Sequence, residues 1–125
     1  MSRAVLISLL LVLGCQGPLS GGIRAFEESR FVEAASELRA AHPDSLDRDE
    51  LARWALYLGL SELALGNLHN ALPRLCSARA VLERHPDALS LSERGALESA
   101  WRALGKMPAE ALSLGTACGR TPGSR

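Results

Sequence analysis

The sequence predicts an all-α fold, arranged as a short helix-turn-helix solenoid of about two to three units. Leucine and alanine dominate the chain and aromatic residues make up only 4% of it, a composition that favours helices over sheets. The chain also repeats itself, because residues 28–35 and 65–72 superpose at an offset of 37. A self-similar period in this range is typical of helical solenoids.

The first element, residues 1–14, has the pattern of a cleaved signal peptide. Arg3 is basic, Ala4 to Leu13 form an apolar stretch, and Gly14 is a small residue before Cys15. As a helix, this stretch would measure roughly 15 Å, half of a hydrocarbon core of about 30 Å. We therefore do not expect it to span a membrane.

The ending Val12-Leu13-Gly14-Cys15 resembles the bacterial lipoprotein signal. The resemblance implies cleavage before Cys15, lipid on the Cys15 sulfur, and a periplasm-facing place in the cell envelope. Gln16 is not Asp, which in the enterobacterial sorting rule favours the outer membrane. An ordinary secretion signal and an uncleaved anchor are the alternatives.

A flexible tether is predicted over residues 15–22, which comprise the lipidated Cys15 and a stretch rich in glycine and small residues. The folded helical domain is expected over residues 23–118. Residues 119–125 are expected to be a disordered tail.

The first unit is predicted to begin with a stunted helix over Ile23 to Glu28. Its companion covers Phe31 to Ala41. His42-Pro43 stops this second helix, because the residue before a proline avoids the helical conformation. Four positions match the second unit at the offset of 37: Phe31 with Leu68, Ala34 with Ala71, Leu38 with Leu75, and Ala41 with Ala78.

The central unit contains the best-defined helix. It begins near Asp47, where Asp47 and Glu50 have the spacing of a capping box. Leucines on two of its faces indicate burial on two sides. Gly66-Asn67 ends it, because glycine and asparagine tolerate the left-handed conformation of a helix stop.

Two more helices and a short third one follow. One is predicted to start at Asn70, with Pro73 in its first turn, and to run to about Arg84. The next opens at a capping box of Ser90 and Glu93, runs to Leu104 and ends at Gly105. A last short helix is predicted from Pro108 to about Leu114.

Small and apolar residues at fixed places make these units resemble the tetratricopeptide repeat (TPR), a helix-turn-helix unit of 34 residues. The resemblance rests on Leu58-Gly59, Gly66-Asn67, Ala71-Leu72, Ala78 and Pro86 in the central unit, on Phe31, Ala34, Ala41 and Pro43 in the first, and on Trp101, Gly105, Ala111 and Leu112 in the last. It implies a concave face, lined by the leading helices, that accepts a peptide segment.

Carried onto this chain, the concave face would be a mainly apolar groove flanked by two arginines. The candidate residues are Arg53, Leu56, Leu60, Leu63, Ser92, Ser99 and Arg102. The alternative is that the first unit covers the leucines and that water solvates the arginines, because an apolar helical stripe is usually core.

Two cysteines remain besides Cys15. If Cys76 and Cys118 are bonded, the bridge closes a loop of roughly 40 residues, worth about 3 to 4 kcal/mol on the chain-entropy model. The alternative is a small buried side chain at Cys76 and a free thiol at Cys118.

The sequence offers no catalytic or cofactor chemistry. The histidines lie before prolines or in a turn, at His42, His85 and His69, and have no metal-ligand spacing. No nucleophile elbow or phosphate loop occurs. The formal net charge is zero, so we expect neither nucleic-acid binding nor attraction to an anionic surface. We therefore expect no metal, no cofactor and no enzymatic activity.

These patterns predict a lipid-anchored adaptor of the bacterial envelope that binds another envelope protein or peptide segment. The most specific version of this prediction is an assembly or pilotin-like factor for a secretion, pilus or outer-membrane complex, by analogy with lipoproteins of similar architecture. A structural subunit of a larger complex or of a homo-oligomer is the alternative, and a regulator of an enzyme is a more distant one.

Overall fold

The computed structural model describes residues 17–106 and Cys118. Within this part of the chain the structure consists of helices, and it contains no strand. The elements are α2 (Pro18–Glu27), α3 (Phe31–Ala40), the 3-10 turn η1 (Pro43–Ser45), α4 (Arg48–Ala64), α5 (Leu68–Arg84) and α6 (Leu91–Gly105). The predicted all-α fold is confirmed. The predicted signal peptide, Cys15, the short helix from Pro108 and the tail lie outside the described residues.

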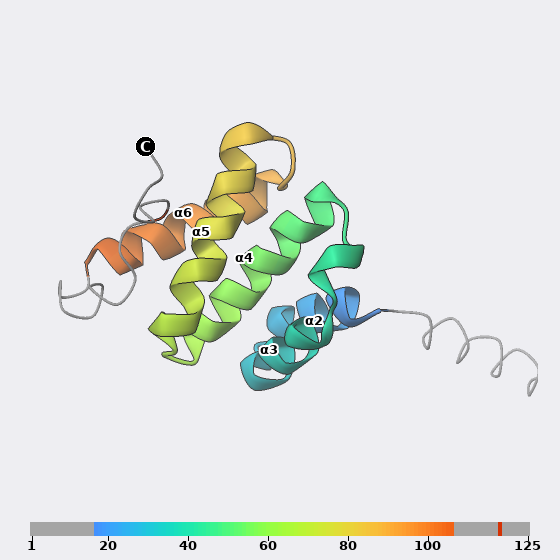
Figure 1. Ribbon diagram of the computed structural model, residues 1–125. Helices are drawn as coiled ribbons and strands as arrows, with labels where there is room; N and C mark the ends of the chain where they lie inside the picture. The colour runs from blue at the N-terminus through green and yellow to red at the C-terminus, as the bar shows by residue number, and fades with distance from the viewer. Residues whose placement is uncertain (1–16, 107–117, 119–125) are drawn as a thin grey trace, which may run out of the picture.

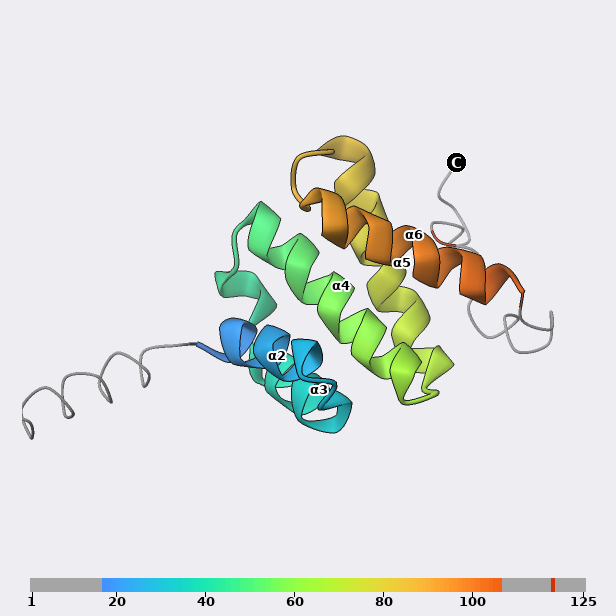
Figure 2. The ribbon, with the colours of Figure 1, turned by 180° about the vertical axis from the view of Figure 1, so that it is seen from behind.

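The helices form two hairpins, α2 with α3 and α4 with α5, followed by α6 (Figure 1). α4 is the central helix, because it packs against α3 and α5 and also contacts α2 and α6. Seen from behind, α2 and α6 lie on opposite sides of α4 (Figure 2). The arrangement is a short stack of helical hairpins, as the 37-residue repeat predicts.

Both predicted capping boxes are present. The Glu50 backbone N–H donates to Asp47 Oδ1 at 2.8 Å, and the Asp47 backbone N–H donates to Glu50 Oε1 at 3.2 Å. Ser90 and Glu93 make the same reciprocal pair at the start of α6. Each box satisfies backbone donors that the first turn of a helix leaves unpaired, and so it fixes where α4 and α6 begin.

The offset of 37 also appears in the backbone of the turns. Ser29, which follows α2, has φ of 61°, and Gly66, which follows α4, has φ of 80°. Ser29 is the only non-glycine residue with positive φ in the described part of the chain. Both hairpins therefore turn through a left-handed residue at the same repeat position.

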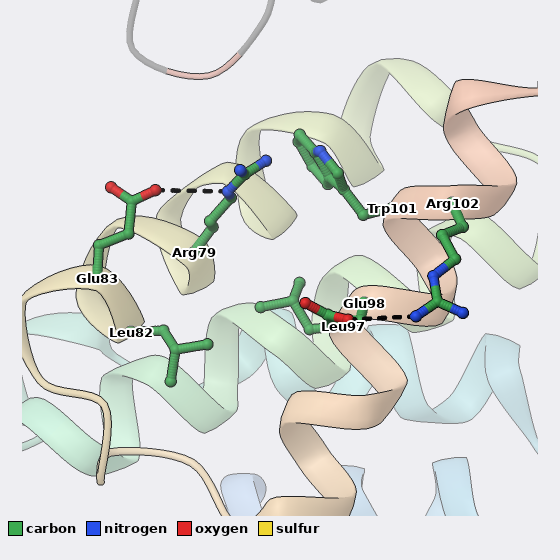
Figure 3. Close-up of a pocket in the computed structure, with 7 residues that line it drawn as sticks. All are labelled: Arg79, Leu82, Glu83, Leu97, Glu98, Trp101 and Arg102. Atoms are coloured by element: carbon green, nitrogen blue, oxygen red, sulfur yellow. Dashed lines mark hydrogen bonds and ion pairs between the residues drawn. The ribbon is translucent and has the colours of Figure 1, made fainter.

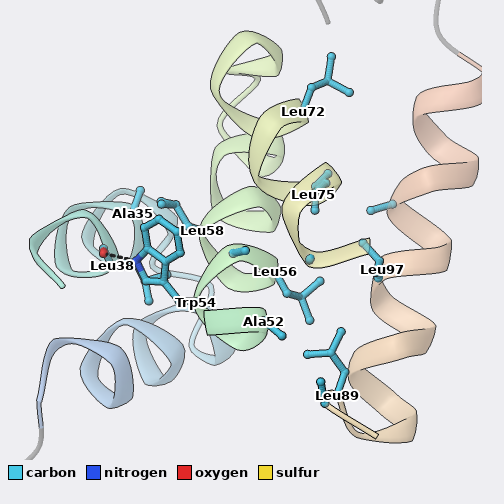
Figure 4. Close-up of a cluster of buried hydrophobic side chains, with 14 of the residues drawn as sticks. Ala35, Leu38, Ala52, Trp54, Leu56, Leu58, Leu72, Leu75, Leu89 and Leu97 are labelled. Carbon is cyan, nitrogen blue, oxygen red and sulfur yellow. Dashed lines mark hydrogen bonds between the residues drawn. The ribbon is translucent and has the colours of Figure 1, made fainter. Parts of the chain in front are cut away.

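The core lies around α4, as Figure 4 shows. The largest fully buried apolar side chains are Leu38, Leu56, Leu58 and Leu75. Leu38 and Leu75 are equivalent positions of the two hairpins, so the repeat places the same residue type at the centre of each. A hydrogen bond links α4 to α3, because the Trp54 indole N–H donates to the Leu38 carbonyl oxygen at 2.7 Å.

The predicted tether over residues 15–22 is wrong for residues 18–22, which form the first half of α2. Gly22 is buried against α3, where an added Cβ would lie 2.5 Å from Leu38 Cγ. Its repeat partner Gly59 has the same role, since a Cβ there would lie 2.7 Å from Leu75 Cδ2. The glycine-rich stretch is therefore a site of close helix packing. The first leading helix, predicted as stunted from Ile23, is ten residues long.

A Gly22→Ala substitution is expected to lower the free energy of unfolding by about 1 to 3 kcal/mol, because the new methyl group overlaps the Leu38 side chain. Urea denaturation followed by circular dichroism measures the change. Gly95→Ala is the matched control, because Gly95 lies in α6 with nothing within 4 Å of an added Cβ. That control should gain up to about 1 kcal/mol from helix propensity. Equal effects at both glycines would contradict the packing role of Gly22.

The start of α5 also differs from the prediction. The helix begins at Leu68, with Asn67 as its N-cap, so Pro73 lies inside the helix and not in its first turn. Leu68 is the repeat partner of Phe31, where α3 begins. The position in the repeat therefore decides where the helix starts, and the missing N–H of Pro73 is tolerated at an exposed position.

Candidate functional site

The predicted groove between the leading helices does not form as a continuous apolar surface. Leu56 is 0% exposed and lies in the core beside Leu89 and Leu97 of the α6 region (Figure 4). Leu60 and Leu63 are half-buried at the edge of the same cluster. Leu56 is thus a core residue, because α6 packs across the face of α4 that carries it.

Arg53 of the predicted set is held in an ion pair between α4 and α6. Its Nε donates to Glu93 Oε2 at 3.1 Å, and the Glu93 side chain is only 10% exposed. The other Glu93 oxygen caps the Ser90 backbone N–H at 2.9 Å. Glu93 therefore caps the start of α6 and also links α6 to α4. Arg53 is the α4 partner in this link, so its side chain already has an ion-pair partner within the domain.

Tyr57 completes this polar cluster. Burial raises the pKa of Tyr57 to about 12, and a hydrogen bond to Glu93 adds to the effect. Burial by itself would raise the pKa of Glu93, but hydrogen bonds from Ser90, Arg53 and Tyr57 outweigh it and lower that pKa. The cluster is internally paired, and its chemistry is that of a structural link between two helices.

The remaining predicted residues, Ser92, Ser99 and Arg102, are exposed on α6. Arg102 pairs with Glu98 on the same helix at 3.4 Å. The structure therefore does not bring the two predicted arginines to one groove, because Arg53 is bound to Glu93 whereas Arg102 borders a different hollow.

That hollow is a groove between α5 and α6 with a volume of about 410 Å³ (Figure 3). The residues that line it are Arg79, Leu82, Glu83, Leu97, Glu98, Trp101 and Arg102. Leu97 is buried, whereas Leu82 and Trp101 are half-buried. The groove has an apolar floor with charged side chains along both rims.

The rims are electrostatically balanced. Arg79 on α5 pairs with Glu83 at 3.4 Å, and Arg102 on α6 pairs with Glu98 at the same distance. The Arg79 guanidinium also lies over the Trp101 ring, 5.0 Å from its centre. Exposed pairs of this kind contribute about 0 to 1 kcal/mol each, so their charges are free to exchange partners at little cost.

The structure joins Cys76 of α5 to Cys118 by a disulfide, with the two Cα atoms 5.0 Å apart. Both cysteines line a second hollow, of about 500 Å³, which shares Arg79, Glu83 and Trp101 with the groove. The bridge therefore lies beside the groove and ties the chain after α6 back to α5.

Sequence patterns did not single out Arg79, Leu82 or Glu98 as surface-site residues. In the sequence, Trp101 is one of the residues that carry the resemblance to the tetratricopeptide repeat, and it is not a predicted groove residue. One signal was present: Arg79 and Glu83, and Glu98 and Arg102, are opposite charges four residues apart, beside the only tryptophan of the third unit. Such spacing marks one exposed helix face, but it does not say that two such faces meet.

A second buried carboxylate lies on the other side of α4. Glu62 has a side chain that is 2% exposed and accepts from Arg39 Nε at 3.0 Å and from Asn67 Nδ2 at 2.9 Å. Burial alone would raise the pKa of Glu62, but these hydrogen bonds and the Arg39 charge lower it. Glu62 thus ties α3 to the turn between α4 and α5, and it is a structural group.

Acid is expected to destabilise the fold through these two carboxylates. Both Glu62 and Glu93 have pKa values below the ordinary value of 4.5. Their contribution is therefore present above about pH 4.5 and is lost as the pH falls through the lowered values. Urea midpoints measured from neutral to acidic pH should show the drop, and the double variant Glu62→Gln, Glu93→Gln should flatten it. An unchanged pH dependence in that variant would contradict the assignment.

Among residues 17–106 and 118, no group of three or more His, Cys, Asp or Glu side chains is placed to hold a metal ion. Within the same residues, no helix has the length and apolar character needed to cross a membrane. Comparisons with protein-family models, with curated proteins and with solved structures found no match to this chain.

Proposed function

We propose that this chain is a lipid-anchored adaptor of the bacterial envelope that binds another envelope protein. The observation that carries the proposal is the groove that the described residues of α5 and α6 form, with Leu82, Leu97 and Trp101 as its apolar lining. The signal-like residues 1–14 and Cys15 supply the membrane attachment. No cofactor and no catalytic step are part of the proposal.

The groove suits an amphipathic helix of the partner. It lies between two helices, and the side-chain ridges of a further helix can pack into a groove of this kind. Leu82, Leu97 and Trp101 would contact the apolar stripe of that helix. Because both rims carry charges of both signs, a matching helix has acidic and basic residues flanking its stripe.

The TPR-like pattern supports an interaction role, since helix-hairpin stacks present extended surfaces to protein partners. By analogy with lipoproteins of related build, the partner belongs to an envelope machine, and the role is that of an assembly or pilotin-like factor for a secretion, pilus or outer-membrane complex. Placement would be the mechanism: acyl chains on Cys15, at about 0.8 kcal/mol per buried CH₂, hold the domain at the membrane while the groove docks its partner.

Photocrosslinking in intact cells tests the adaptor proposal. A photoreactive residue at Arg102, on the rim of the groove, should crosslink to one defined envelope protein. The same residue at Val32, which is 69% exposed on α3, is the control and should not capture that protein. A Trp101→Ala substitution should abolish the Arg102 crosslink while circular dichroism stays unchanged. Identical crosslinks from Arg102 and Val32 would contradict the proposal that the groove is the binding surface.

A structural role within an oligomer is the second candidate. It is favoured by two apolar side chains that are largely exposed to solvent, Val32 and the 78% exposed Leu91. Size-exclusion chromatography with light scattering on residues 16–125 distinguishes the candidates. A stable monomer would count against an obligate homo-oligomer, whereas a concentration-independent dimer would favour it.

A further inference from the structure

α2 begins very close to the proposed lipid attachment. Pro18 is its first residue and Gly17 its N-cap, so only Gln16 and Gly17 separate Cys15 from the helix. Three Cα-to-Cα steps of 3.80 Å span at most about 11 Å. The start of α2 therefore cannot lie farther than about 11 Å from a lipid-bearing Cys15.

α2 is a firm part of the domain. Gly22, Ile23 and Ala25 are buried, and the helix packs against both α3 and α4. Moving α2 away from the rest of the domain would break the close contact between Gly22 and Leu38. The position of the Cys15 lipid consequently restricts the position of the whole domain.

The start of α2 and the end of α6 lie at opposite ends of the molecule (Figures 1 and 2). The groove and the disulfide are on the side of α6. Gly17, Pro18 and Ser20 are exposed at the opposite end, and residues 17–23 contain no charged side chain, so the charge nearest to this turn is the Glu37 carboxylate of α3 beside Gly21. Approach to the lipid headgroups there requires no desolvation of a charge on α2 before Arg24.

From these observations we infer that the first turn of α2 lies against the lipid headgroups and that the groove between α5 and α6 is directed away from the membrane. The inference rests on the proposed lipidation of Cys15. In this arrangement, the end of the domain where α2 begins contacts the bilayer surface. The domain therefore does not move freely at the end of a long tether. It also leaves the groove open to a partner in the aqueous space.

Fluorescence quenching on vesicles tests the orientation. The lipidated full chain, with the Cys76–Cys118 bridge oxidised, carries a fluorophore on Ser20→Cys in α2 or on Ser99→Cys in α6. The vesicles are phosphatidylcholine with a nitroxide quencher on the headgroup of a minor lipid. Quenching of the Ser20 label should exceed quenching of the Ser99 label severalfold, since both parent side chains are exposed but only Ser20 lies at the lipid end.

A spacer variant is the matched control. Inserting about ten glycine and serine residues after Gln16 lengthens the connection to an r.m.s. span of about 17 Å, so quenching at Ser20 should fall. Equal quenching of both labels on floated vesicles, or no effect of the spacer, would overturn the orientation while leaving the lipid anchor intact. Failure of the unlabelled protein to float with the vesicles would overturn the anchor itself, and the orientation with it.

Discussion

Replacing Leu56 by alanine is expected to lower the free energy of unfolding by about 2 to 5 kcal/mol. Leu56 is fully buried at the point where α6 crosses α4, with Leu89 and Leu97 nearby in the core. The substitution removes apolar contacts and leaves a cavity that helices held by the Arg53–Glu93 pair cannot easily close. Urea denaturation of the purified domain, followed by circular dichroism, measures the loss.

Leu60→Ala is the matched control for this prediction. Leu60 lies one turn further along α4 and was assigned to the same groove from the sequence, but it is half-buried. Its loss should be clearly smaller, because less of its surface is removed from water on folding. If the two variants lose the same stability, Leu56 does not have the special core position that the structure gives it.

Removing the disulfide is expected to cost about 4 kcal/mol. The bridge joins residues 42 apart, and on the chain-entropy model it restricts the unfolded chain by about this amount. The double variant Cys76→Ser, Cys118→Ser leaves no unpaired thiol of the pair. Its urea midpoint, compared with that of the oxidised chain, measures the effect.

Reduction of the wild-type protein with dithiothreitol should produce the same loss, and the reductant should leave the serine variant unchanged. If the serine variant is as stable as the oxidised chain, removal of the bridge does not raise the conformational entropy of the unfolded chain by the expected amount, and the prediction is contradicted. The same variant should also lose the Arg102 crosslink to the partner, since the bridge borders the groove through Arg79, Glu83 and Trp101.

Local signals predicted most helix ends correctly. The boxes of Asp47 with Glu50 and of Ser90 with Glu93 begin α4 and α6 as expected. Gly66 follows the end of α4 at a positive φ, and α5 stops at Arg84 before His85-Pro86. These signals succeed because each depends on hydrogen bonds and backbone angles within a few residues.

The glycine-rich start of the domain was predicted wrongly because local composition and packing disagree there. Two adjacent glycines indicate a flexible chain when their neighbours in space are unknown. The repeat offset gives the missing information, since Gly22 lies 37 residues before Gly59 and Leu38 lies 37 before Leu75. In both hairpins the glycine has no side chain, and this leaves room for the leucine of the following helix.

The candidate groove was misplaced for a related reason. The periodicity of α4 identifies Arg53, Leu56 and Leu60 as residues near one face, but it does not say how closely α6 covers that face. The structure buries Leu56, pairs Arg53 with Glu93, and forms an apolar groove between α5 and α6 among the residues that it describes.

The sequence by itself determined the helical class, the repeat, the principal caps and the cysteine pair available for a bridge, because these follow from composition, spacing and short-range hydrogen bonding. Only the tertiary structure decided which apolar faces are covered, that the glycines of α2 are packing sites, and that Trp101 opens onto a groove. Those features depend on how α3, α5 and α6 approach α4 across long stretches of chain, and burial is a property of that approach and not of any single helix.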